Sequence, residues 1–144
     1  MNKLYFNFTE LFHSDIAKAN GINNTTNDLK VLTNLLNLLF YLLNPLREKL
    51  GKPIKIDCAY RSPALNAKIG GTSSPRGHSS GCCADLIIDG MTKQAQFDFI
   101  RKSGLEYDQL IWEQDNNCIH VGYVHGDNRK QTMIRDSKGN YKNV

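Results

Sequence analysis

The chain has 144 residues, of which 40% are hydrophobic and 22% are charged, and its net charge at neutral pH is +4. These values are typical of one globular domain that buries its own core without disulfide bonds, so we expect a single domain over residues 1–144. The basic residues are scattered and form no stripe with aromatic residues between them, which argues against a nucleic-acid-binding protein.

The N-terminal residues do not resemble a secretory leader. They lack a continuous apolar stretch and a cleavage site of small residues. The apolar run over residues 31–43 is interrupted by Thr33, Asn34 and Asn37, and it is shorter than the ~20 residues that cross a bilayer. We therefore expect synthesis in the cytoplasm and no membrane span.

The first half of the chain is predicted to be helical. Thr9 is a suitable N-cap for a helix over residues 10–20, which Gly21 would end. A second, longer helix is expected to begin at Thr26 or Asn27, because apolar residues follow at helical spacing.

The longer helix carries a stripe of leucines, which predicts a face buried in the core. A partner-binding face is the alternative. Pro45 should kink or split the helix, and Gly51 should end it. The leucines of the stripe are Leu32, Leu35, Leu36, Leu39, Leu42, Leu43 and Leu46.

From residue 54 the pattern changes to that of short strands. Residues 54–58 alternate between apolar and polar side chains, which predicts a strand that ends just before Arg61. Residues 70–81 are rich in glycine and serine, and such long loops are usually functional. Residues 83–88 follow as a buried strand that contains Asp85. The other expected elements are helices over residues 64–69 and 93–103, a hairpin of strands over residues 110–113 and 118–124, an edge strand over residues 132–135 and a loose tail from residue 136.

Helices followed mainly by strands indicate an α+β fold. We expect a small antiparallel sheet with helices packed on one side. No internal repeat or low-complexity tract indicates a second domain, and small domains of this kind are usually monomers.

The four cysteines, Cys58, Cys82, Cys83 and Cys118, form no Cys-x-x-Cys pair. Cys82 and Cys83 are adjacent, and a disulfide between neighbours strains the backbone. We expect reduced and mostly buried thiols. A contribution of a cysteine to a metal site is the alternative.

Two histidines and an aspartate form a candidate zinc site. His78 and Asp85 flank a glycine turn, and His120 lies in an apolar run where a strand is expected. A catalytic zinc takes three protein ligands, and imidazole and carboxylate groups suit it. Asp85 lies among apolar residues, where an ionised carboxylate is unfavourable unless it is paired or bound to a metal. The sequence therefore predicts one Zn²⁺ bound by His78, Asp85 and His120.

Residues 8–129 resemble the zinc D-Ala-D-Ala carboxypeptidase family, in particular its short single-domain members from bacteriophages and prophages. The family pattern Ser-x-His-x-x-Gly-x-Ala-x-Asp, with a later histidine, is similar to residues 76–85 with His120. Residues 60–66 resemble the family's segment with an active-site arginine. Residues 108–113 resemble its strand that ends in the catalytic glutamate.

The chain departs from the family pattern at two positions. Arg76 stands where the family has serine, and Cys83 stands where it has alanine. Neither change removes a predicted metal ligand. Ser79, Ser80 or Ser74 would take over the contacts of the missing serine with the substrate, and Tyr123 is a further candidate for the wall of the binding site.

The resemblance implies a catalytic role for two more residues. Glu113 would be the base that takes a proton from a zinc-activated water, whose pKa falls to about 7, and passes it to the departing amine. Arg61 would stabilise the oxyanion or hold a substrate carboxylate. The alternatives are a surface role for Glu113 and a structural salt bridge of Arg61 with Asp57 or Glu113.

The implied activity is hydrolysis of peptidoglycan stem peptides at D-alanine bonds, as a D,D-carboxypeptidase or as an endopeptidase of the endolysin type. The expected partner is a stem peptide, and the expected place of action is the cell wall, reached after release or as part of a virion. The alternative is a catalytically weak zinc-containing module that binds the wall or builds the virion, since hedgehog signalling domains are similar in fold and keep such a metal site. Glu113 and Arg61 favour the enzyme, whereas Arg76 favours the binding module.

Overall fold

Six strands form one mixed sheet, in a computed structural model that describes residues 3–144. The strands lie in the order β1-β2-β4-β3-β5-β6. Neighbouring strands are antiparallel except for β3 and β5, which are parallel, so the expected α+β class is confirmed with one parallel pair added. The strands are β1 (Lys55–Cys58), β2 (Cys83–Ile87), β3 (Gln109–Glu113), β4 (Ile119–Gly122), β5 (Gln131–Arg135) and β6 (Tyr141–Asn143).

The helix expected over residues 10–20 is wrong in its bounds, because two short pieces stand in its place. Asn7 and Ser14, not Thr9, are the caps, since each of their side chains accepts a backbone N–H at the start of a piece. The helical elements are η1 (Phe8–Phe12), α1 (Asp15–Ala19), α2 (Leu29–Leu38), the π-helical turn η2 (Leu39–Leu43), α3 (Asn44–Leu50), α4 (Pro63–Lys68), η3 (His78–Ser80) and α5 (Lys93–Lys102).

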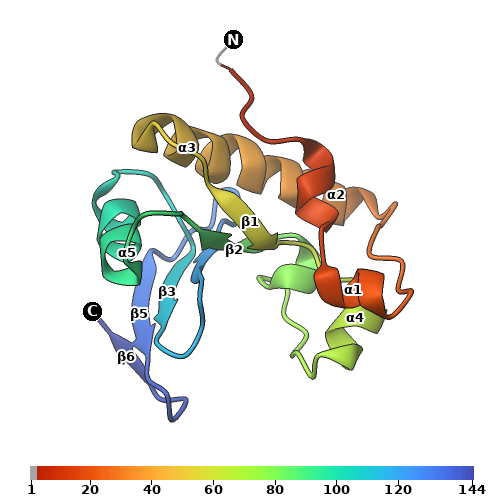
Figure 1. Cartoon of the computed structure of the whole chain (residues 1–144). Coiled ribbons are helices and arrows are strands. Elements are labelled where there is room, and N and C mark those ends of the chain that lie inside the picture. Colours follow the sequence, from red (N-terminus) through yellow and green to blue (C-terminus); the bar gives the residue numbers. More distant parts are fainter. Residues whose placement is uncertain (1–2) are drawn as a thin grey trace.

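The elements α2, η2 and α3 form one long helix along the upper side of Figure 1. Its cap is Asp28, whose carboxylate accepts the backbone N–H groups of Lys30 and Val31, so the start lies one or two residues after the expected one. The interruption expected at Pro45 takes the form of a π-helical turn, and the helix continues beyond the proline. The π-helical turn directly before it carries the chain past the residue that lacks an N–H. Gly51 ends the helix in the left-handed conformation, at φ +74°, as expected.

The leucine stripe of this helix is buried in the core, as predicted. By length and composition alone, Leu29–Leu50 could cross a membrane. The inner face of the helix nevertheless packs on the sheet, which is the pattern of a core helix. Leu36 is the clear exception in the stripe, since 41% of its surface is exposed. The fully buried members are Leu35, Leu39, Leu42, Leu43 and Leu46.

Alternation along the central strands gives the sheet two different faces. Leu86 of β2 and Val121 of β4 belong to the same hydrophobic core as the long helix and α5. Side chains one residue away, such as Asp85 and His120, point to the opposite face. That second face, which we call the open face, is lined by polar groups and hollowed.

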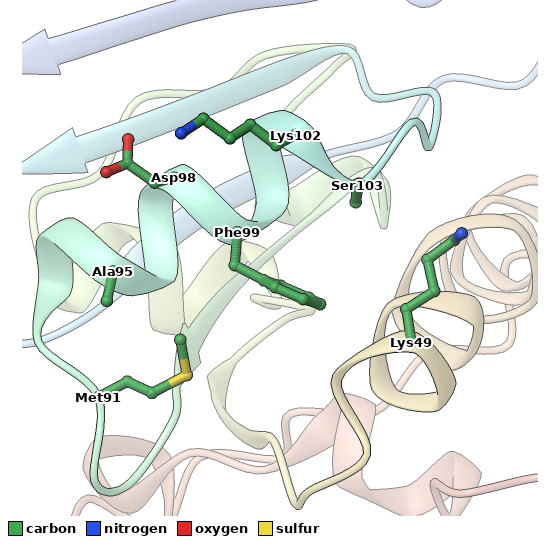
Figure 2. A pocket seen from close by; sticks show the side chains of 7 residues that line it. All are labelled: Lys49, Met91, Ala95, Asp98, Phe99, Lys102 and Ser103. Atoms are coloured by element: carbon green, nitrogen blue, oxygen red, sulfur yellow. The ribbon is translucent and has the colours of Figure 1, made fainter.

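An open groove of about 460 Å³ lies between α3 and α5, within the helical layer. Phe99 points into the groove and Met91 lies beside it, with Lys49 and Lys102 at the rim (Figure 2). The groove shares no lining residue with the hollows of the open face.

The tail from residue 136 is not loose throughout, which corrects the expectation. The carboxylate of Asp136 accepts the backbone N–H groups of Lys138 and Asn140 and so forms a turn. After this turn, β6 pairs with β5 at the edge of the sheet.

Candidate metal centre

Three of the predicted site residues meet on the open face. Asp85 in β2 stands directly opposite His120 in β4, and His78 comes from η3 at the end of the 70–81 loop. One carboxylate oxygen of Asp85 lies 2.9 Å from Nδ1 of His120. The other oxygen lies 3.5 Å from Nε2 of His78. The structure thus brings together the residues that were predicted to bind zinc.

His78 is oriented by a backbone carbonyl. Its Nδ1 lies 2.6 Å from the carbonyl oxygen of Ala59, just after β1. A carbonyl oxygen only accepts, so Nδ1 carries the proton and donates it to this contact. Nε2 is left to face Asp85, which is the usual arrangement of a histidine that binds a metal.

A thiol lies in the same cluster. Cys83 precedes Asp85 by two residues in β2, so the two side chains lie on one face of the sheet. Sγ of Cys83 and the ligand nitrogens of His78 and His120 all lie within 4.8 Å of one another. The thiol and the two imidazoles are therefore close enough to hold one metal ion, and the Asp85 carboxylate contacts both imidazoles.

The charges of the cluster suit a divalent cation. Burial raises the pKa of Asp85, but hydrogen bonds from His120 and His78 outweigh it and hold that pKa well below its usual range. Burial lowers the pKa of both histidines, whereas Cys83 and Asp85 raise it more, to about 9 for His120 and well above the usual value for His78. The buried carboxylate thus requires positive charge beside it. Protons on the imidazoles or a metal ion can supply that charge, since both use the same lone pairs.

Arg61 contacts the buried aspartate as well. Its Nη2 lies 3.3 Å from Oδ2 of Asp85, and its Nε donates to Sγ of Cys58 at 3.3 Å. The salt bridge that was the alternative for this arginine is made with Asp85 and not with Asp57 or Glu113. The arginine side chain is 22% exposed, so it can also meet a bound molecule.

Glu113 ends β3 on the same side of the sheet. Its carboxylate accepts the side-chain amide of Asn116, and Nη1 of Arg135 lies 3.9 Å away. It lines one hollow with the other predicted catalytic and metal-binding residues. That hollow has a volume of about 240 Å³ and is lined by Arg61, His78, Asp85, Glu113, Asn116, Cys118 and His120.

A second hollow of about 340 Å³ adjoins the first. The two share Arg61, His78, Glu113 and His120, so the histidines lie where the hollows meet. The second hollow extends to Tyr141 at β6. Together they form a continuous polar surface beside the candidate metal ligands.

Among the residues predicted to contact substrate, Ser74 lines the second hollow, whereas Ser79, Ser80 and Tyr123 lie outside both hollows. The hydroxyl of Ser80 donates to the carbonyl oxygen of Ser74 at 2.8 Å. Within residues 3–144, the buried hydroxyl of Ser79 has no hydrogen-bond partner. Tyr123 is buried and stacks on Tyr41, with ring centroids 5.6 Å apart. Substrate binding remains a prediction for Ser79, Ser80 and Tyr123.

Sequence reasoning missed the role of Arg76. Its Nη1 donates to Oδ1 of Asp108 at 2.7 Å, and its Nη2 donates to Asp127. Arg129 holds the same Asp108 through Nε at 3.0 Å and Nη2 at 2.8 Å. We call Asp108 with its two arginines, Arg76 and Arg129, the Asp108 clamp. The one sequence signal for it was Arg76, which stands where the family has serine.

Asp108 is the centre of the clamp and is only 1% exposed. Burial raises its pKa, but hydrogen bonds from Arg129 lower it more, so the pKa lies below the usual value. The clamp joins the 70–81 loop to the start of β3 and to the turn after β4. Its arginine from the loop, Arg76, lies two residues before His78. The clamp therefore fixes the loop that carries one candidate metal ligand.

Residues 4–122 match the protein family described as Peptidase M15. The match covers most of the chain and includes the loop, the strands and the histidines of the candidate metal centre. No curated protein matches the chain significantly.

Proposed function

We propose that this protein uses one zinc ion to hydrolyse peptidoglycan stem peptides at D-alanine bonds. The chain belongs to the peptidase M15 family and is therefore a metallopeptidase. The family match supports peptide hydrolysis with a metal. The likeness of residues 60–66 and 108–113 to the D-Ala-D-Ala carboxypeptidases supports the choice of bond. The observation that carries the proposal is one hollow in which a buried carboxylate, two histidines, a glutamate and an arginine meet.

His78, Asp85 and His120 would hold the zinc, through Nε2 of His78, a carboxylate oxygen and an imidazole nitrogen. When bound, the zinc would polarise the scissile carbonyl and lower the pKa of a water molecule to about 7. The donors fit this ion, because two nitrogens and one oxygen from three residues form a typical catalytic zinc set. The hydrogen bond from His78 to Ala59 supports the fit, since it holds the imidazole in the orientation that binding requires.

Glu113 is placed to move a proton. The Asn116 amide donates to its carboxylate and fixes the carboxylate at the wall of the hollow. A carboxylate oxygen of Glu113 would accept a proton from the attacking water and deliver it to the leaving amine nitrogen. Proton transfer of this kind accelerates a reaction by about 10²–10⁴-fold.

Arg61 is placed to bind the substrate. Its guanidinium group keeps its charge at any pH relevant to the protein and lines both hollows. It would stabilise the carbonyl oxygen as negative charge develops there, or hold a carboxylate of the stem peptide. Its contact with Asp85 orients it toward the metal ligands.

We also infer that the protein acts as a monomer on the cell wall, after release from the cytoplasm or as part of a virion. The net charge of +4 supports approach to the anionic polymers of the wall. The joined hollows suit both removal of a terminal D-alanine and cleavage of a cross-link.

Digestion of purified peptidoglycan by the zinc-loaded protein, followed by mass spectrometry, tests the proposal. Glu113→Gln is the matched control, because the amide keeps the shape of the side chain but does not accept the proton. We expect new stem-peptide ends with the wild type and none with the variant. The mass that is lost separates a carboxypeptidase from an endopeptidase. If zinc-bound wild type leaves walls of several stem chemistries intact, the proposal fails and the zinc-containing binding or virion module is favoured.

A further inference from the structure

The two adjoining hollows offer a metal two side chains that can be anionic, one from each hollow. Asp85 is one of them, and Cys83 is the other, two residues earlier on the same face of β2. Sγ of Cys83 belongs to the same 4.8 Å cluster as the ligand nitrogens of His78 and His120. The thiol is fully buried, so it faces the cluster and not solvent.

The pairing of β2 with β4 places no side chain directly opposite the Cys83 thiol. His120 stands opposite Asp85, and Gly122 stands opposite Cys83. Glycine has no side chain, so β4 places no group beside the thiol at that position. The sulfur and the imidazole of His120 therefore lie on one face with no residue of β4 between them.

The thiols of Cys82 and Cys58 make contacts outside the 4.8 Å cluster. Sγ of Cys82 lies 3.6 Å from the carbonyl oxygen of Pro75 and 3.7 Å from that of Ser80, and donates to them. Sγ of Cys58 accepts Nε of Arg61 at 3.3 Å. Cys82 is adjacent to Cys83 and equally buried, yet it is outside the cluster, which makes it the natural control.

We propose that the thiolate of Cys83 is a ligand of the metal held by His78 and His120, together with the carboxylate of Asp85. The inference rests on the proposed metallopeptidase function, since it concerns the same metal. Sulfur beside two nitrogens selects zinc over magnesium, calcium and manganese, which prefer oxygen donors. Cysteine binds metals as the thiolate, so one proton leaves as the metal binds. Zinc expands to five ligands in some catalytic sites, so a fourth protein ligand is compatible with hydrolysis.

Cobalt(II) substitution of the full chain tests the inference by absorption spectroscopy. Sulfur bound to cobalt gives a charge-transfer band in the near ultraviolet, whereas the visible d–d bands report only that cobalt is held. We expect the near-ultraviolet band in the wild type and in Cys82→Ala, and its loss in Cys83→Ala and Cys83→Ser. Zinc affinity, measured by competition with a chelating dye, should fall about tenfold or more in both Cys83 variants and stay unchanged in Cys82→Ala.

The possible outcomes separate this inference from the proposed function. Visible cobalt bands without the near-ultraviolet band would overturn the role of Cys83 and leave the metal centre standing. A near-ultraviolet band that survives in both folded Cys83 variants would do the same. Wild-type protein that binds neither cobalt nor zinc would overturn both proposals. Serine keeps the size of the side chain, so loss of the band in a Cys83→Ser protein with native circular dichroism is attributable to the sulfur.

Discussion

The metal centre around Asp85 and the Asp108 clamp share one arrangement, an aspartate surrounded by cationic side chains, but the cationic residues differ. Each centres on a buried aspartate that cationic side chains neutralise. The clamp uses two arginines, which keep their charge, whereas the metal centre uses two histidines, whose ring nitrogens can bind a metal ion in place of a proton. Asp85 can therefore exchange protonated partners for a metal ion, and Asp108 cannot. Histidine partners allow the carboxylate of Asp85 to bind a metal, whereas arginine partners limit the carboxylate of Asp108 to a structural role.

The two regions are also connected. Arg76 of the clamp lies two residues before His78, on the same loop. The clamp fixes this loop against the start of β3, and Ala59 fixes the His78 ring itself. Loss of the clamp should therefore lower the stability of the fold that carries the metal centre without removing a ligand, whereas loss of the metal centre should leave the clamp intact.

Asp85→Ala should have the largest effect, because it removes the carboxylate at the middle of the metal centre. We expect zinc to be lost on dialysis and peptidoglycan hydrolysis to fall to background. Stability in the presence of zinc should fall too, since a ligand that binds only the folded state stabilises it. Zinc content by mass spectrometry and thermal unfolding with and without zinc are the measurements. A variant that still holds one zinc per chain would show that Asp85 is not a required ligand.

Arg61→Ala should come next. We expect turnover to fall about 10²–10³-fold with zinc retained, as for the loss of one oxyanion-stabilising donor. Arg61→Lys is the control, since it keeps the charge but not the planar fork. Turnover equal to that of the wild type would reduce Arg61 to the structural salt bridge with Asp85.

Asp108→Asn should lower stability without removing the metal ligands. We expect a loss of about 3 kcal/mol in the free energy of unfolding, near the lower end for breaking a buried ion pair. The lower end applies because Arg129 is 42% exposed and can turn to solvent. Denaturant unfolding of the wild type and the variant measures this loss in the free energy of unfolding. A variant as stable as the wild type would show that the clamp contributes nothing to folding.

The smallest effect should appear when the stability difference between the wild type and Asp108→Asn is followed as a function of pH. The pKa of Asp108 is lower in the folded protein than in the unfolded chain, where it is near 3.9, so its stabilisation is fully present above about pH 4. The stabilisation is lost as the pH falls through the folded pKa. The gap in melting temperature between the wild type and Asp108→Asn should therefore narrow below about pH 4. A gap that stays constant into strong acid would contradict this account of the clamp.

The sequence predicted the class of the fold and the residues that meet in the hollow, but not how they meet. Short apolar runs placed Asp85 and His120 in strands, whereas their direct opposition depends on a register that only tertiary packing sets. The partners Arg76 and Asp108 are 32 residues apart, and no local pattern joins them.

The errors in the helices have a similar cause. Asn7, Thr9 and Ser14 are all suitable caps by residue type, and packing chose between them. Strand β6 is exposed along its whole length, so it has no apolar alternation that could have revealed it.

The most direct test of the difference between the metal centre and the clamp is the zinc content of Asp85→Asn and Asp108→Asn. The two variants are purified in parallel, their zinc is measured by mass spectrometry, and their folding is checked by circular dichroism. Both substitutions replace a buried carboxylate with an amide of the same shape. The account predicts that Asp108→Asn keeps one zinc per chain and unfolds more easily, whereas Asp85→Asn folds but loses the metal. Equal zinc in the two variants would contradict the assignment of the metal centre to Asp85.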